Sequence, residues 1–321
     1  MMTKYLYGRR VRVILYAKSG KVTFEYAQTE TKSMGISFNI PFSDSATPAT
    51  CSVTLMNLAA KHRKLFEPGC KVEVYAGYAQ DGVGLLSSGA IRHTSPMTSD
   101  GTNNTFSFTY REGDEYQTAK SSVQEANDKL DKERAHEVKV LGKKAAAKLP
   151  KIKKHSAMSF AKGSSAETII RRVASDAGIK LTKVYLKKNH VYKKGYTVSG
   201  KPLSCIQKIA KQCGSQVFMR RGGVYIDDLS KAMGHKEHIL ITTKLKGSHG
   251  GTGLTAYPTT DQENAEAKHA TWEVVSLLRY QISTGSVVTV QDRFLSGTFR
   301  VKSGVHACDD SSFTTTMEVY V

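Results

Sequence analysis

The positive charge of this 321-residue chain is concentrated in one continuous stretch. The whole sequence carries 47 Lys and Arg against 28 Asp and Glu, which gives a formal net charge of +19. Between Val138 and Ile226 there are 21 basic residues and only two acidic ones, Glu167 and Asp176, so this stretch holds the entire excess. A compositional step of this kind marks domain boundaries. It predicts two charge-balanced outer parts and a basic middle.

The first outer part consists of short apolar runs separated by turn residues. VRVILYA and KVTFEYA flank Lys18-Ser19-Gly20, which predicts a β-hairpin. Apolar and polar residues alternate from Cys51 to Leu55, as in strands that have one face in solvent. One short helix is expected from Ala59 to Leu65. Many short strands at this spacing predict an antiparallel sandwich or barrel.

The basic stretch contains a helical connector and a small α/β domain. Helix formers dominate from Gln117 to His155, and Lys139 to Lys154 contains seven lysines and no acid. Further on, Ala166–Gly178 predicts a helix with one apolar face, and its pattern returns 36 positions later around Ile206–Gly214. Each helix is followed by a predicted strand. The middle domain is therefore expected to have two related halves.

After this domain the strand pattern returns, in segments such as ATWEVVSLL and GTFRVKSGVHAC. The expected fold class is β-rich α+β, with two antiparallel β modules separated by the connector and the α/β domain. The predicted boundaries are 1–116 for the first β module, 117–158 for the connector, 159–230 for the α/β domain and 231–321 for the second β module.

No pattern for catalysis or metal binding is present in the sequence. The five cysteines are scattered and lack Cys-x-x-Cys spacing, and no P-loop or Gly-x-Ser-x-Gly motif occurs. Asp227 and Asp228 are adjacent, so in a strand they would point to opposite faces. We therefore expect a protein that is not an enzyme and has no cofactor or metal. No apolar run approaches the roughly 20 residues of a membrane-spanning helix, and no signal peptide is predicted.

The basic middle has two interpretations that the residues leave open. Tyr185, Tyr192 and Tyr196 are interleaved with lysines, as in proteins that stack bases beside a charged groove. No helix-turn-helix, RRM or zinc-finger pattern frames them, so a solvated face or contact with an acidic partner protein is the alternative to polyanion binding. The candidate contact residues are Lys151, Lys153, Lys154, Lys187, Lys188, Lys193, Lys194, Arg220 and Arg221.

The order of the β segments resembles that of phage tail hub proteins, which are also found in contractile injection particles. The first module matches at Thr50–Leu58, Phe66–Tyr78 and Leu85–Ile91. The end of the chain matches at Thr271–Leu278 and at Gly297–Asp310. The two halves of the α/β domain are also similar to segments of the family pattern, whereas the Lys-rich connector has no counterpart in it.

This resemblance implies two tail-tube-like modules in one chain. It implies a homotrimer that forms a pseudo-hexameric ring around the tail channel, between the tail tube or distal tail protein and the tip or spike. Other baseplate proteins and DNA passing through the channel would be further contacts. The protein would be made in the host bacterial cytoplasm, reside in the virion tail and serve genome ejection.

In the hub interpretation, the lysines of the middle domain are expected to face an acidic protein surface. Two alternatives remain from the sequence. One is a nucleic-acid-binding protein that uses its basic middle. The other is a peptidoglycan-binding tail component, because Gly195–Val198 followed by Pro202 and Ile206 resembles a LysM module.

Overall fold

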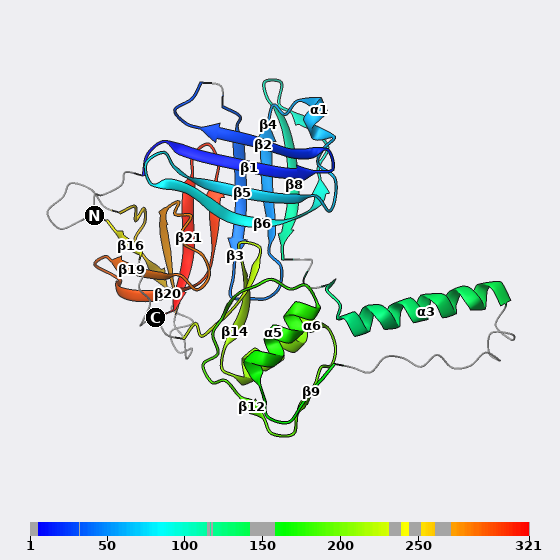
Figure 1. Cartoon of the computed structure of the whole chain (residues 1–321). Helices are drawn as coiled ribbons and strands as arrows, with labels where there is room; N and C mark the ends of the chain where they lie inside the picture. Colours follow the sequence, from blue (N-terminus) through cyan, green and yellow to red (C-terminus); the bar gives the residue numbers. More distant parts are fainter. Residues whose placement is uncertain are drawn as a thin grey trace. The chain divides into compact units, whose positions relative to one another are not determined.

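The computed structural model describes residues 6–31, 33–113, 116, 118–141, 158–230, 239–243, 252–260 and 271–320 (Figure 1). The chain forms two compact units. The first, called the β unit, combines Met1–Asp114 with Gln216–Val321, and the second, the α/β unit, spans Glu115–Ser215. The two charge-balanced outer parts therefore fold together. The four-part division stays a prediction, and the hairpin at 216–227, expected in the middle domain, belongs to the β unit.

The N-terminal half of the β unit is an antiparallel two-layer sandwich. Its elements are β1 (Arg9–Ala17), β2 (Gly20–Ala27), β3 (Ile36–Phe42), β4 (Thr50–Met56), α1 (Ala60–Arg63), β5 (Lys71–Tyr78), β6 (Gly82–Thr94), β7 (Thr98–Ser99) and β8 (Asn104–Glu112). The strand order is β3-β4-β8-β6-β5-β1-β2, with β7 paired to β8. In Figure 1, β1, β2, β5 and β6 run across β3, β4 and β8. β6 pairs with strands of both layers, and bulges at Val74/Tyr75 and Ile91/His93 supply the bend.

The core of this half lies between the two layers. In β3 the side chains of Phe38 and Ile40 are buried and that of Asn39 is exposed, which is the alternation of a strand with one wet face. Phe108 of β8 and Val74 of β5 face the same core. The antiparallel sandwich or barrel predicted from the sequence is thus confirmed, in the form of a sandwich. The predicted hairpin is confirmed as well, because β1 and β2 join through the two residues Lys18-Ser19.

The C-terminal half adds a second set of strands with its own core. These strands are β14 (Gln216–Arg220), β15 (Gly223–Asp227), β16 (Ile239–Thr242), β17 (Thr259–Thr260), β18 (Thr271–Leu277), β19 (Val287–Gln291), β20 (Ser296–Cys308) and β21 (Phe313–Tyr320). Neighbouring strands run in the order β17-β18-β21-β20, and β19 joins β20 to β16, whereas β14 and β15 pair with each other outside this sheet. The β16–β19 pair is parallel, which the sequence did not predict. Val288, Val301 and Met317 are central to this core.

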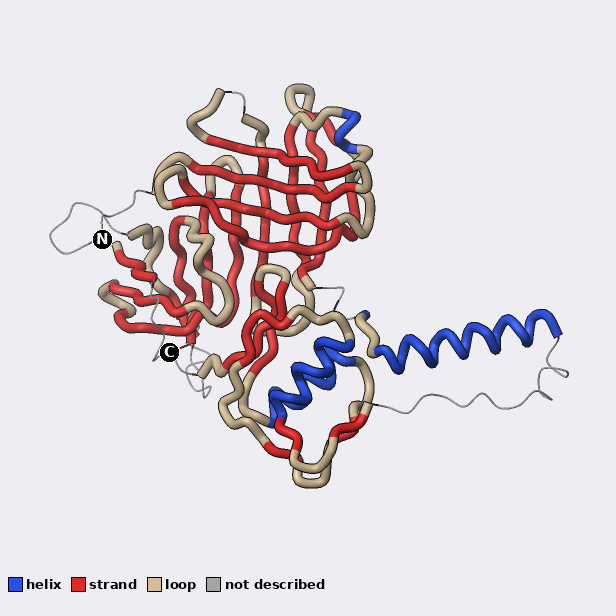
Figure 2. The backbone as a smooth tube through the Cα atoms, viewed as in Figure 1, coloured by secondary structure: helices blue, strands red, loops and turns tan. Residues whose placement is uncertain are grey.

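One long strand joins the two halves into a single sheet. β20 has 13 residues, and its end, Gly304–Cys308, pairs antiparallel with Phe38–Phe42 of β3. Figure 2 shows the resulting continuity of strands between the halves. Leu278 and Phe313, from the C-terminal half, are buried in the N-terminal core. The β unit is therefore held together by backbone pairing and by a shared core.

The α/β unit contains the two related helices predicted from the repeat. Its elements are α3 (Ser122–Leu141), β9 (Ser159–Phe160), β10 (Ser164–Ser165), α5 (Ala166–Asp176), β11 (Leu181–Val184), β12 (Val191–Tyr192), β13 (Tyr196–Thr197) and α6 (Pro202–Gln212). α5 begins at a Ser165 cap, whose Oγ accepts from the Thr168 N–H at 3.3 Å, and α6 begins with Pro202. Gly178 and Gly214 follow the two helices in the left-handed region.

The connector helix α3 differs from α5 and α6 in its burial. No side chain from Ser122 to Val140 is buried, and Val140 is 67% exposed. The connector is thus helical from Ser122 to Leu141, within the range where helix formers dominate. The lysines between residues 142 and 157 lie outside the described residues.

Candidate functional site

An extensive polar network in the β unit surrounds the loop between β18 and β19. This junction loop, Arg279–Ser286, presents its backbone carbonyls to cationic and imidazole side chains from distant strands. Arg221 donates to Tyr280 O, Arg220 to Gln281 O and Thr284 O, His306 to Ile282 O, and Arg300 to Gly285 O. Because loop carbonyls in a buried position need donors, these side chains allow the loop to be buried.

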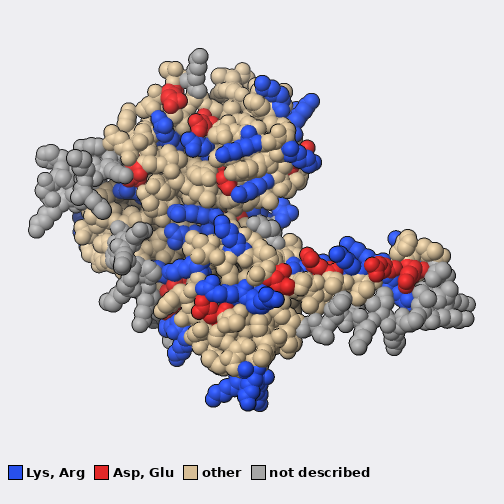
Figure 3. Space-filling view, in the orientation of Figure 1, with Lys and Arg blue, Asp and Glu red and all other residues tan. Residues whose placement is uncertain are grey.

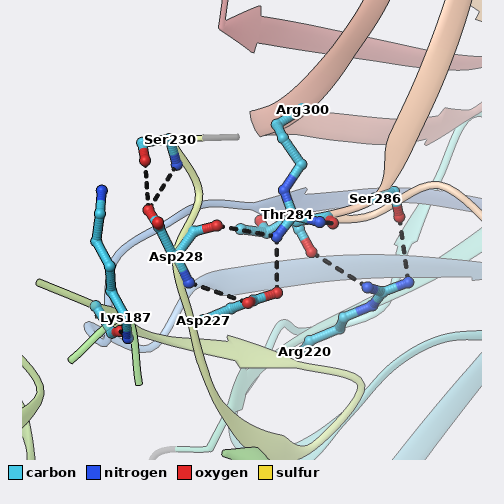
Figure 4. A network of polar contacts seen from close by, with 10 residues as sticks. Lys187, Arg220, Asp227, Asp228, Ser230, Thr284, Ser286 and Arg300 are labelled. Carbon is cyan, nitrogen blue, oxygen red and sulfur yellow. Dashed lines mark hydrogen bonds and ion pairs between the residues drawn. The ribbon is translucent and has the colours of Figure 1, made fainter. Parts of the chain in front are cut away.

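A buried ion pair lies at the centre of this network (Figure 4). Arg300 is 2% exposed, and its Nη2 lies 2.7 Å from Asp227 Oδ2, which is buried as well. The other Nη of Arg300 donates to Gly285 O at 2.6 Å. The pair thus connects β15, β20 and the junction loop. A buried charge that has both an ionic partner and hydrogen bonds is tolerated, whereas either partner alone would be costly.

The β14–β15 hairpin supplies two further, partly buried arginine side chains, those of Arg220 and Arg221. Its turn is Arg221-Gly222, and both residues have positive φ, as a two-residue type I′ turn requires. Gly222 N donates to Glu112 Oε1 at 2.6 Å, which anchors the turn to the end of β8. Burial, together with the neighbouring Arg221, lowers the pKa of Arg220 to about 10. Arg220 therefore remains charged at neutral pH.

His306 belongs to a chain of hydrogen bonds in which each group has a defined role. The backbone N–H of Arg279 donates to Thr315 Oγ1 at 3.0 Å, and Thr315 Oγ1 lies 2.9 Å from His306 Nδ1. His306 Nε2 lies 3.1 Å from Ile282 O, a pure acceptor. Nε2 must then carry the proton, and Nδ1 accepts from the threonine hydroxyl. Complete burial lowers the pKa of His306 to about 3.

This buried imidazole gives a testable dependence of stability on pH. The folded-state pKa of about 3 lies below the ordinary value of 6.5, so the neutral form stabilises the fold. Its contribution is complete above pH 6.5 and is lost as the pH falls from there toward 3. Urea titrations between pH 6 and 4 should give a free energy of unfolding that is less pH-dependent in His306→Gln than in the wild type, by up to about 1.4 kcal/mol per pH unit. Parallel curves for the two proteins would contradict this assignment.

The junction loop also contacts the N-terminal half directly. Arg279 Nη1 lies 3.7 Å from Asp81 Oδ1, and Gln281 Nε2 donates to Asp81 Oδ2 at 3.3 Å. The ring of Tyr280 lies against Gly84 of β6, where an added Cβ would come within 2.0 Å of the ring. Glycine at position 84 is thus required by the close approach of Tyr280. The loop binds the two halves together through side chains as well as backbone.

The hydrogen bonds and ion pairs around the junction loop are suited to holding the loop rigidly in place. Within the described residues, no three His, Cys, Asp or Glu side chains are grouped so as to hold a metal ion. Burial raises the pKa of the Cys51 and Cys308 thiols to about 12, which leaves them protonated and poorly nucleophilic. No helix in the described part of the chain is long and apolar enough to cross a membrane.

The candidate contact residues named from the sequence fall into three groups. Arg220 and Arg221 belong to the β unit and donate to the junction loop, a structural use of both that the sequence did not predict. The remaining described candidates are exposed residues of the α/β unit. These are Lys187, Lys188, Lys193 and Lys194. Lys151, Lys153 and Lys154 lie outside the described residues.

Sequence reasoning did not identify Arg300 as a member of this network. The available signal was the position of Arg300 between Phe299 and Val301 in an otherwise apolar part of β20. A charged side chain that faces a core needs a partner. The partner, Asp227, is 73 positions away and could not be identified from spacing.

Comparison with known proteins gives a consistent result at the level of fold. No protein-family model matches the sequence, and no curated protein matches it by sequence. Among solved structures, the prophage MuSo2 43 kDa tail protein from Shewanella oneidensis is similar with a TM-score of 0.58 and 12% identity, over 96% of this chain and 97% of that one. The tail protein from Neisseria meningitidis MC58 has a TM-score of 0.57 and 10% identity, over 98% and 97%.

A third similar structure comes from a secretion apparatus. The E. coli c3393 protein, described as a type VI secretion component similar to the T4 bacteriophage tail proteins gp27 and gp5, has a TM-score of 0.50 and 8% identity, over 91% of this chain and 75% of that one. Identities this low establish the fold alone. The chain therefore has the fold of phage tail proteins, as the resemblance of its β segments predicted.

Proposed function

We propose that this chain is a non-catalytic structural hub of a phage tail or of a related tail-like particle. In this role three copies form a ring of six β modules around the tail channel. The ring joins the tail tube or a distal tail protein to the tip or spike. It contacts other baseplate proteins and surrounds the path of DNA during ejection. Assembly takes place in the host bacterial cytoplasm.

The observation that carries this proposal is the β3–β20 pairing. It fuses two β modules edge to edge into one sheet, within a fold shared with tail proteins. A subunit that supplies two modules as one rigid piece needs only three copies to make a six-module ring. The buried junction loop supports the same role, because it fixes the angle between the modules.

The outermost strands of the sheet are consistent with ring closure. Among the described strands, β2 pairs only with β1, β17 only with β18, and β16 only with β19. Unpaired strand edges invite association with another chain. Edges on opposite modules would give a head-to-tail contact, and such contacts close into a ring when the rotation per subunit divides a full turn.

The solution mass of the protein tests this proposal. We expect the chain, produced with its tube and tip partners, to give a particle that contains three copies of the 35.2 kDa subunit in analytical ultracentrifugation. A chain that stays monomeric in the presence of both partners would overturn the hub assignment. Purification of the chain alone serves as the reference, because it shows whether trimer formation needs the partners.

A further inference from the structure

The α/β unit exposes all of its described basic side chains from Met158 to Ser215. This segment has ten Lys, two Arg and only two acids, and each of the twelve basic residues is exposed. Figure 3 shows Lys and Arg side chains densely grouped at the bottom of the view, near β12 in Figure 1. Like charges at this density repel one another and reduce the stability of a compact unit. Their presence in one segment therefore points to a polyanionic partner.

Both acids of this segment are already engaged. Glu167 pairs with Arg171 one turn along α5, with Nη2 2.7 Å from Oε1. Asp176 accepts from the N–H of Ser122 at 2.9 Å and from its hydroxyl at 2.7 Å, at the start of α3. Two carboxylates with such partners compensate little of the charge of ten lysines.

The strand pairing of the unit brings three of these lysines together. β9 pairs with β13 and β10 with β12, so the turns that join them, around Lys162 and around Lys193-Lys194, lie side by side. Gly163 N and Gly195 N both donate to Tyr192 O, at 3.0 and 3.1 Å. We call Lys162, Lys193 and Lys194 the lysine tip. Lys162, 31 positions before Lys193, was not among the residues selected from the sequence.

Gly195 holds the two turns at this close distance. Its φ is +80°, and a Cβ at this position would lie 2.6 Å from Phe160 O. Glycine is therefore required here for both conformation and space. The positions of the tip lysines thus follow from the fold of the two turns.

The type of cation distinguishes between the possible partners. The cations of the junction network in the β unit are arginines that are buried or partly buried, whereas ten of the twelve exposed basic residues described here are lysines. Lysine is a mobile point charge that suits repeated contacts with phosphates and does not favour planar bidentate recognition. Lysine is also depleted in the buried parts of protein–protein interfaces. An acidic protein surface, which the sequence had favoured, fits these properties less well.

We propose that the lysine tip and the lysines around it bind a phosphodiester polymer through its backbone, without sequence specificity. A nucleic acid and a polyglycerol phosphate of the teichoic acid type present the same repeating chemistry. The proposal does not depend on the hub function, because neither the β3–β20 pairing nor the outermost strands of the sheet involve this surface.

Binding of a fluorescent duplex DNA of random sequence to the full chain, followed by anisotropy at several salt concentrations, tests the proposal. Replacing Lys162, Lys193 and Lys194 with Gln should weaken binding by roughly tenfold at low salt and reduce the slope of log K against log salt by up to about 2.7. The matched control replaces Lys21, Lys61 and Lys64, which are exposed lysines of the β unit, with Gln. It removes the same charge and should leave binding nearly unchanged.

Competition identifies the source of the phosphate. Displacement of the DNA by polyglycerol phosphate, but not by polyglutamate of equal charge, supports phosphodiester recognition. Of DNA and polyglycerol phosphate, the polymer that binds the protein with higher affinity is the better candidate ligand. Equal displacement by polyglutamate, or a tip variant that binds DNA like the control variant, overturns the proposal. Circular dichroism of both variants should match the wild type, because all six side chains are exposed. The ultracentrifugation result for the trimer should be the same for the tip variant.

Discussion

Replacing Arg300 with methionine is expected to lower the free energy of unfolding of the β unit by about 3–5 kcal/mol. The methionine fills much of the same volume but leaves the Asp227 carboxylate buried without its ionic partner, and it removes the donor to Gly285 O. The cost arises mainly from the uncompensated charge. Urea denaturation followed by tryptophan fluorescence measures it, since Trp272 lies in the C-terminal half.

Two further variants distinguish this mechanism from a general effect of mutation in β20. Lys302, also on β20, forms a partly exposed ion pair with Glu318 of the neighbouring strand β21, with the Nζ and Oε2 atoms 3.2 Å apart. Lys302→Met breaks this pair and should cost less than about 1 kcal/mol. The double variant Arg300→Met with Asp227→Asn should recover part of the loss, because it removes the orphaned charge. If Arg300→Met is no more costly than Lys302→Met, the buried pair does not hold the junction.

Replacing Gly304 with alanine should disrupt the strand that joins the two halves. A Cβ at position 304 would lie 2.3 Å from Thr316 O and 2.6 Å from Phe42 Cζ. β20 cannot shift to relieve this contact, because it is paired with β21 on one side and with β3 on the other. Overpacking of this kind typically costs about 1–3 kcal/mol, and we expect a value at or above the upper end because backbone atoms clash.

Gly35→Ala provides a matched control for this second variant. Its Cβ would also be crowded, at 2.7 Å from Met56 Sδ, but the flexible methionine side chain can move away. Thermal unfolding should therefore show a large decrease in melting temperature for Gly304→Ala and a small one for Gly35→Ala. If the decrease for Gly304→Ala is as small as that for Gly35→Ala, the β20 backbone is free to adjust, and the case for a rigid two-module sheet is weakened.

Local sequence patterns predicted much of the fold. The alternation in Cys51–Leu55 corresponds to β4, and the turn at Lys18-Ser19-Gly20 joins β1 to β2. The repeat at 36 positions corresponds to α5 and α6, whose buried faces include Val173 and Ile206. These features depend on residues close together in sequence, where the period of burial or the preference of a turn decides the structure.

Features that depend on distant residues could not be predicted in this way. The strand pattern of β20 does not reveal that its partner is β3, because any two half-buried strands of similar length would satisfy the same pattern. Arg220 and Arg221 were grouped with the neighbouring lysines as surface residues. The carbonyls that bind them belong to a loop about 60 residues further along the chain, and nothing in the local composition signals this contact.

The shared sheet also determines the order in which the protein can mature during synthesis. The N-terminal half includes Leu278, Cys308 and Phe313 in its core, and β3 has β20 as its outer neighbour. While the ribosome is still translating the middle of the chain, this half has an incomplete core and an open strand edge. Its core is complete only after the segment up to Phe313 has emerged. Folding of the N-terminal half thus depends on strands that are made almost at the end of translation.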